Sequence, residues 1–294
     1  MGRYGVPVSD VLAIDIGGTK MVAALVADDG VVRCRVQVPT SDTDDPEVLF
    51  GSLAGAIDQV MTEPADVLAC GVGCGGPMSR GGATVSPLNI RAWRDFPLRS
   101  RLEAHTGLGV TIDNDAKALA LSEGWLGAAR GVDHYLAMVV STGVGAGIVV
   151  DGRLLDGAEG NAGHLGHVVV VPDGRPCACG SHGCLEAEAS GTAIAAITGQ
   201  PPAVAGPAMR HHVGTLVGRA VAQAAVLLDL RLALVGGSVG LGYGDALLDA
   251  AQGEIDRMAR IAYARGVRIA AVGLGADAPV IGAAALARPR GGRE

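Results

Sequence analysis

The chain has 294 residues, enough for one large domain or two of ordinary size, and its 49% hydrophobic and 18% charged residues are typical of a soluble globular protein. Its formal net charge of -7 argues against a nucleic-acid partner, because proteins that bind the phosphate backbone carry a basic stripe. No apolar run approaches the ~20 residues of a membrane span, and no basic-then-apolar leader opens the chain, so we expect a cytoplasmic protein with no membrane partner.

The first patterned segment, residues 11–38, predicts an antiparallel meander of three strands with turns at Gly-Gly-Thr and Asp-Asp-Gly. Asp15 ends the first strand, and Gly17, Gly18 and Thr19 follow it, so a carboxylate and several free backbone N–H groups share one sheet edge. This arrangement is typical of a phosphate cradle with a metal-facing acid beside it. A plain hairpin explains the glycines but not the flanking Asp and Thr. From this segment alone, both interpretations stay open.

An alternation of helices and strands follows the meander. The predicted elements are helices over 46–62 and 97–106, and strands over 67–73 and from Val110. The glycines of Gly71-x-Gly73-x-x-Gly76 formally fit a dinucleotide fingerprint, but Pro77 and no helical pattern follow them. We therefore interpret these glycines as positions where the backbone approaches a ligand.

Asp115 is the acid that we assign to chemistry. It lies at a strand-to-helix junction in D-N-D-A, where acidic residues often only cap the helix that follows. That capping role suits Asp113 or Asn114 equally well, which leaves at least one carboxylate to face a ligand. A carboxylate aimed at a hydroxyl accepts its proton as the oxygen attacks a γ-phosphoryl group. Glu123, further along the same helix, stays unassigned.

Residues 135–155 repeat the plan of residues 11–38: strand, Ser/Thr-Gly turn, Gly-rich strand, Asp-Gly turn, strand. Two copies of one unit predict a duplicated α/β fold whose halves, residues 1–115 and 116–294, face each other across a cleft. Each copy would bring a Gly-rich hairpin to the same phosphate chain. The last helix, over 279–288, is expected to pack back on the N-terminal half.

A cluster of cysteines follows the second hairpin. His167, Cys177, Cys179 and Cys184 have the spacing H-x9-C-x-C-x4-C, and the glycines among them allow tight turns. The pattern favours a closed, structural zinc site over three reduced surface thiols, because Cys-x-Cys does not easily form its own disulfide. The apolar run after His167 is interpreted as a strand. The loop would present His164 on one side and Glu186 on the other.

The final third is predicted to be helical around a strand core. The predicted elements are helices over 186–198, 208–229, 241–265 and 279–288, and strands over 230–235 and 267–272. The first of these strands ends in Gly236 and Gly237, a side-chain-free floor for a nucleotide base or ribose. A tight turn between strand and helix explains the same glycines equally well.

Seven motifs together carry a family resemblance. They are D-I-G-G-T-K at Asp15 to Lys20, G-V-G-C-G-G-P at Gly71 to Pro77, N-D-A at Asn114 to Ala116, S-T-G-V-G-A-G at Ser141 to Gly147, A-G-H-L-G-H at Ala162 to His167, C-A-C-G-S-H-G-C-L-E at Cys177 to Glu186 and V-G-G-S at Val235 to Ser238. From residue 10 to 288, in family order, they resemble the ROK family of sugar kinases, repressors and open reading frames.

The resemblance implies an actin-like (ribonuclease H-like), two-lobed α/β fold with ATP, Mg²⁺ and a hexose between the lobes, and a homodimer. It implies Asp115 as the catalytic base and a zinc ion held by His167, Cys177, Cys179 and Cys184. The implied sugar contacts are Gly76, Asn89, Asn114, Asp115, His164, His167 and Glu186. The expected nucleotide contacts are Asp15, Gly17, Gly18, Thr19, Lys20, Thr142, Gly143, Val144, Gly145, Gly236 and Gly237.

His164 departs from the pattern of most of the family, where a glutamate holds this position. Bacterial N-acetylmannosamine kinases resemble the chain at this point. An imidazole both donates and accepts hydrogen bonds, which suits a 2-acetamido group, so we expect phosphorylation of N-acetylmannosamine at O6, feeding sialic-acid breakdown. A glucokinase, or a kinase for another hexose or N-acetylhexosamine, is the alternative. A non-catalytic, sugar-responsive regulator is a weaker one, because the first phosphate loop leaves no room for an N-terminal helix-turn-helix.

Overall fold

The computed structural model describes residues 10–288, which group into two compact units. The first unit holds the chain up to Ser122, the short segment Gly157–Asn161 and the chain from Ala276. The second unit holds Glu123–Asp156 and Ala162–Gly275. The first crossing between units therefore lies after Ser122, whereas the sequence suggested a boundary between residues 115 and 116.

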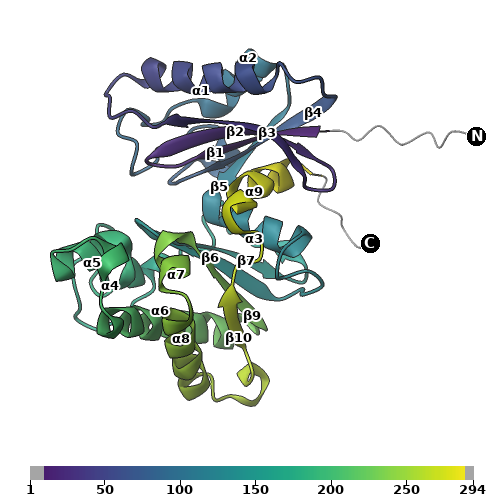
Figure 1. Cartoon of the computed structure of the whole chain (residues 1–294). Coiled ribbons are helices and arrows are strands. Elements are labelled where there is room, and N and C mark those ends of the chain that lie inside the picture. The colour runs from purple at the N-terminus through teal and green to yellow at the C-terminus, as the bar shows by residue number, and fades with distance from the viewer. Residues whose placement is uncertain (1–9, 289–294) are drawn as a thin grey trace, which may run out of the picture. The chain divides into compact units, whose positions relative to one another are not determined.

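The first unit is built on a five-stranded sheet with the order β3-β2-β1-β4-β5 (Figure 1). Its strands are β1 (Asp10–Ile16), β2 (Lys20–Ala27), β3 (Val32–Pro39), β4 (Val67–Cys74) and β5 (Val110–Asn114). The strands β1, β2 and β3 pair antiparallel, as the predicted meander requires, and β4 and β5 extend the sheet in parallel from β1. The carboxyl ends of β1, β4 and β5 consequently meet at one edge.

Helices cover both faces of this sheet (Figure 1). They are α1 (Pro46–Val60), α2 (Leu98–Thr106), α9 (Ala278–Ala287) and the first part of α3 (Asp115–Trp125). Helix α1 begins at Asp45, whose carboxylate accepts a hydrogen bond from the Glu47 N–H at 2.9 Å, with Pro46 at the first helical position. Its apolar face, which includes Leu49 and Leu53, is buried against the sheet. Helix α9 packs on β1 and β4 of the same unit.

The second unit repeats this sheet, with the order β10-β9-β6-β7-β8. Its strands are β6 (Tyr135–Val140), β7 (Val144–Val150), β8 (Arg153–Leu154), β9 (Leu232–Gly236) and β10 (Arg268–Ala271). Again three strands pair antiparallel in chain order, and two parallel strands follow on the other side of the first. The duplicated α/β fold that the two hairpins predicted is therefore confirmed.

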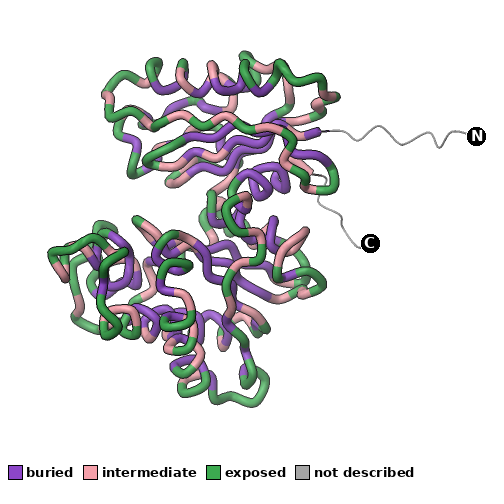
Figure 2. The backbone as a smooth tube through the Cα atoms, in the orientation of Figure 1, coloured by how far each residue is buried: buried purple, intermediate pink, exposed green. Residues whose placement is uncertain are grey.

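The helices of the second unit enclose a separate core, visible as the buried segments of Figure 2. They are α4 (Leu185–Ala189), α5 (Gly191–Thr198), α6 (Pro207–Leu228), α7 (Gly237–Tyr243) and α8 (Asp245–Met258). The predicted single helix over 241–265 is wrong. The chain breaks at Gly244, whose φ of 53° and ψ of −134° interrupt the helix, and α8 ends at Met258. The predicted strand after His167 is also wrong, because only an isolated bridge joins Val169 to Cys184 there.

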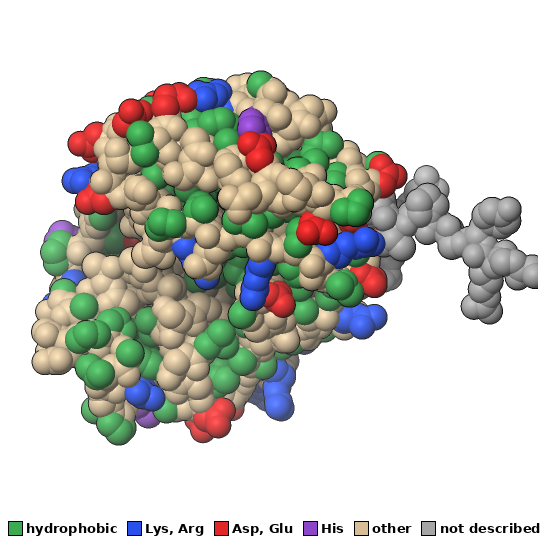
Figure 3. Space-filling model, turned by 45° about the horizontal axis from the view of Figure 1, so that its top comes forward, with side chains coloured by type: hydrophobic (Ala, Val, Ile, Leu, Met, Phe, Trp, Pro, Cys, Tyr) green, Lys and Arg blue, Asp and Glu red, His purple; other side chains and the backbone are tan. Residues whose placement is uncertain are grey.

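Within residues 10–288, no helix combines the length and hydropathy needed to cross a bilayer. On the face drawn in Figure 3, acidic and basic side chains lie interspersed.

Candidate functional site

The strand register of the first unit aligns two acidic residues on either side of a glycine at one sheet edge. Asp15 on β1 lies level with Gly73 on β4, and Gly73 lies level with Asp113 on β5. One residue further, Ile16, Cys74 and Asn114 form the next row. Because parallel strands end together, the turn after Asp15 and the start of α3 come to the same edge, where open α/β sheets bind their ligands.

Asp15 and Asp115 influence each other across Gly73. Gly73 lies between them: a Cβ atom added to it would be 3.9 Å from Asp15 Oδ1 and 3.7 Å from the Asp115 Cα, so both residues pack against this glycine. Burial, and to a lesser extent the negative charge of Asp115, raises the pKa of Asp15 to about 7, although Lys20 at the start of β2 opposes the shift. Two neighbouring carboxyl groups in different surroundings are typical of sites that transfer protons or bind cations.

Asp113 has a structural role. Its Oδ1 lies 3.3 Å from the Nζ of Lys117, which is only 2% exposed, and Lys117 also donates a hydrogen bond to the Gly160 carbonyl at 2.8 Å. Asn114 Oδ1 accepts a hydrogen bond from the Ala116 N–H at 3.0 Å, so it caps the start of α3. Asp113 thus takes the ion-pairing role, while Asn114 and Asp115 share the Ala116 N–H at the start of α3, with Asp115 Oδ1 at 2.8 Å.

Three more of the predicted contacts, Gly18, Gly76 and Asn89, lie close to other predicted residues of this unit. A Cβ on Gly18 would lie 2.6 Å from the Asn89 Cβ, and one on Gly76 would lie 3.7 Å from Asn114 Nδ2. A cavity of about 200 Å³ opens beside Gly18 and Asn89, lined also by Thr40, Ser41, Asp42, Thr43, Leu49, Ile90 and Arg91. The Thr40 hydroxyl donates to the Gly17 carbonyl at 2.8 Å, which braces the first turn. Sequence analysis missed the lining residues after β3, although the run T-S-D-T is unusually polar.

In the second unit, the hairpin between β6 and β7 carries the other predicted phosphate contacts. The Ser141 N–H donates to the Gly143 carbonyl at 2.9 Å and closes the turn. The Thr142 carbonyl accepts the Thr192 hydroxyl at 3.0 Å. The Ser141 hydroxyl lies 2.9 Å from the Ser238 hydroxyl, so the Gly236–Gly237 turn is a direct neighbour of the hairpin. The structure therefore brings all the predicted nucleotide-side residues of this unit together.

Glu186 and the two histidines approach the same hairpin. Glu186 Oε2 accepts the Val144 N–H at 2.8 Å. Gly163, at a φ of +102°, packs so tightly on β7 that an added Cβ would lie 2.1 Å from the Ala146 carbonyl oxygen. This close approach fixes the segment that carries His164 and His167, whose rings stack at 5.9 Å with an angle of 24°.

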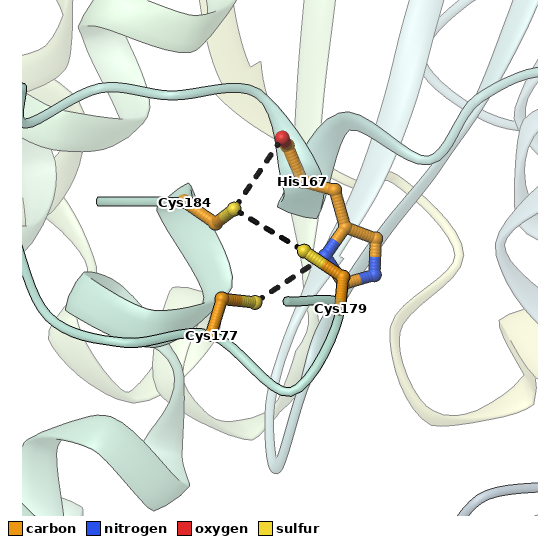
Figure 4. A group of neighbouring side chains, drawn as sticks. All are labelled: His167, Cys177, Cys179 and Cys184. Atoms are coloured by element: carbon orange, nitrogen blue, oxygen red, sulfur yellow. Dashed lines mark hydrogen bonds between the residues drawn. The ribbon is translucent and has the colours of Figure 1, made fainter. Parts of the chain in front are cut away.

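The four predicted metal ligands form one cluster (Figure 4). Their ligand atoms all lie within 4.8 Å of one another. Cys177 Sγ lies 3.6 Å from His167 Nδ1, and Cys179 Sγ lies 3.7 Å from Cys184 Sγ. Tetrahedral zinc would separate sulfur from nitrogen by about 3.6 Å and sulfur from sulfur by about 3.8 Å, given ~2.3 Å and ~2.0 Å bonds. The geometry of the donor set thus fits a closed zinc site.

Glu123, which sequence analysis left unassigned, is fully buried. Its carboxylate accepts hydrogen bonds from the N–H groups of Ala128, Gly273 and Leu274 at 2.8–3.2 Å. Glu123 therefore links the end of α3 to Gly273 and Leu274, which lie just before the chain leaves the second unit after Gly275. Nothing local to Glu123 signals this role, because two of its partners lie about 150 residues away.

Comparisons with known proteins agree with these features. The ROK family model matches residues 11–290. A glucokinase of Halalkalibacterium halodurans is 33% identical over 307 residues, which cover 92% of each chain. An N-acetylmannosamine kinase of Citrobacter koseri is 40% identical over 250 residues, which cover 79% of this chain and 84% of the relative. The crystal structure of a ROK family glucokinase from Streptomyces griseus with glucose and AMPPNP superposes with a TM-score of 0.82 at 30% identity, covering 95% of this chain and 99% of the other. The fold is thus the two-lobed, actin-like α/β fold, and the chain belongs to the ROK family.

Proposed function

We propose that the protein is an ATP-dependent sugar kinase that transfers the γ-phosphoryl group of ATP to O6 of N-acetylmannosamine. The observation that carries this proposal is the pairing of Asp15 and Asp115 at one sheet edge, next to a glycine-rich turn. The named activities of the relatives, all sugar kinases at 33–40% identity, support the same reaction class.

In this reaction Asp115 accepts the O6 proton while O6 attacks the γ-phosphorus and the bond to the ADP oxygen breaks. Asn114, Asn89 and Gly76 would orient the sugar, and the two glycine-rich turns would hold the phosphates through backbone N–H groups. Asp15 would face Mg²⁺, which neutralises phosphate charge when bound. A nearby cation would also favour the ionised form of this high-pKa acid.

The cluster of His167, Cys177, Cys179 and Cys184 would hold a structural zinc ion. Because Nδ1 of His167 faces the thiols, its Nε2 is left to contact a sugar hydroxyl. The same loop continues into α4, which carries Glu186. Zinc would therefore shape the sugar side of the site without an open coordination position for chemistry. We further propose that the protein is cytoplasmic and, as the family resemblance implies, a homodimer.

Loss of the metal is expected to weaken sugar binding more than nucleotide binding. Cys184 is fully buried, and its replacement in Cys184→Ala removes one of the four ligands. We expect the wild type to contain one zinc per chain by metal analysis, and the variant to lose it while its KM for the sugar rises at least tenfold. Cys70→Ala, which removes a buried thiol of the first unit, is the matched control and should keep its zinc. A zinc-free wild type with full activity would contradict this role.

A glucokinase is the second candidate, because two glucokinase chains match over nearly the whole length of this one. A coupled assay with ATP against N-acetylmannosamine, N-acetylglucosamine and glucose separates the two. Turnover of glucose alone would favour the glucokinase, and no turnover of any sugar would favour a binding role.

We propose that His164 forms a hydrogen bond with the acetamido group of the sugar. His164→Glu replaces a group that donates and accepts with one that only accepts, so we expect the ratio of kcat/KM for N-acetylmannosamine to that for glucose to fall at least tenfold. His212→Glu, at an exposed position on α6, makes the same change away from the site. An unchanged substrate profile in His164→Glu would remove the reason for choosing this sugar.

A further inference from the structure

The Glu186 carboxylate lies directly on the second glycine-rich turn. Its Oε2 accepts the Val144 N–H at 2.8 Å, and a Cβ on Gly143 would lie only 2.7 Å from the same oxygen. An anionic oxygen at this distance from a backbone N–H of a glycine-rich turn has the geometry expected of a bound phosphate oxygen. Glu186 thus occupies the turn as a phosphate would.

The backbone that carries Glu186 is held in place by the metal loop. Leu185 is fully buried, and its N–H donates to the Val168 carbonyl at 2.9 Å. Cys184, also fully buried, belongs to the metal cluster. The backbone at Glu186 therefore has little freedom to move. Rotation of the Glu186 side chain is then the simplest way to break its contact with the turn.

We propose that Glu186 is a coupling residue that competes with the phosphates of the nucleotide for the second turn until the sugar draws its carboxylate away. This inference rests on the proposed kinase function. Two negative charges about 4 Å apart near a protein surface repel strongly enough to weaken binding by an order of magnitude or more. A sugar hydroxyl that donates to Glu186 removes the competition, so sugar and nucleotide each tighten the binding of the other.

Charge removal at Glu186 tests the competition directly. Glu186→Gln keeps the shape of the side chain and an acceptor for the Val144 N–H but removes the charge. Without sugar, we expect AMPPNP with Mg²⁺ to bind Glu186→Gln about tenfold more tightly than the wild type by isothermal titration calorimetry. Glu188→Gln is the matched control, since Glu188 lies on the same helix but accepts the Arg175 N–H at 2.5 Å instead, and its affinity should equal that of the wild type.

A second measurement needs no variant. In the wild type, saturating N-acetylmannosamine should raise the affinity for AMPPNP about tenfold. Equal or weaker AMPPNP binding in Glu186→Gln, or no effect of the sugar on the wild type, overturns the coupling role while kinase activity stands. A wild type that binds no AMPPNP under any condition overturns both this inference and the proposed function.

Discussion

Asp115→Asn is expected to lower kcat for sugar phosphorylation by a factor of about 10² to 10⁴ while the affinity for the sugar stays within a few-fold of the wild type. The amide keeps the size of the side chain and an oxygen for the Ala116 N–H, to which Asp115 Oδ1 now lies at 2.8 Å. It does not accept the proton that leaves O6. A coupled assay of ADP release gives kcat, and calorimetric titration with the sugar gives the affinity.

The control for this variant lies two residues earlier in the same motif. Asp113→Asn makes the same chemical change but removes the charged partner 3.3 Å from the buried Lys117 ammonium. It should therefore lower the thermal stability, with kcat of the folded enzyme within a few-fold of the wild type. Near-normal turnover in Asp115→Asn, or equal loss in both variants, would remove Asp115 as the base.

The duplicated hairpins were predictable because their signals are local. Alternating apolar residues and Gly-containing turns define each antiparallel pair, and the same order of signals occurs twice in the chain. The cysteine cluster was predictable for a similar reason, since ligand spacing and glycines lie within one short loop.

The errors arose where tertiary contacts override local preference. The run V-V-V-V after His167 has high strand propensity, yet the N–H groups of Val170 and Val171 both donate to the Gly183 carbonyl, at 2.8 and 3.2 Å. The metal loop thus takes the backbone partners that a strand would need. The contact of Glu186 with Val144 and the burial of Glu123 depend on residues far apart in sequence, so no local pattern predicts them.

Asp15→Asn is expected to stabilise the ligand-free protein at neutral pH while it abolishes ATP-dependent turnover. The Asp15 carboxyl is half-buried and lies near Asp115, and burial is the main cause of its raised pKa. Ionising this group in the folded state is therefore unfavourable, which an active site tolerates when the charge is needed for a cation. The neutral amide removes the unfavourable charge and, with it, the acid that would face Mg²⁺.

The pH dependence of stability distinguishes this explanation from others. The unfolded chain loses the Asp15 proton near pH 3.8, whereas the folded protein keeps it up to about pH 7. Between these values the folded state binds more protons, so the free energy of unfolding falls as the pH rises, and the loss is complete above pH 7. Moving the pKa from 3.8 to about 7 corresponds to roughly 4 kcal/mol, and solvent screening at a half-buried side chain reduces the expected effect to about 2 kcal/mol.

Urea unfolding of wild type and variant from pH 4 to pH 8 should therefore show Asp15→Asn gaining about 2 kcal/mol relative to the wild type across that range. Asp58→Asn, at an exposed carboxylate of α1, is the control and should show no such gain. If the free energies of unfolding of Asp15→Asn and the wild type differed by the same amount at every pH, Asp15 would be ionised in both the folded and the unfolded protein, and the explanation would be wrong.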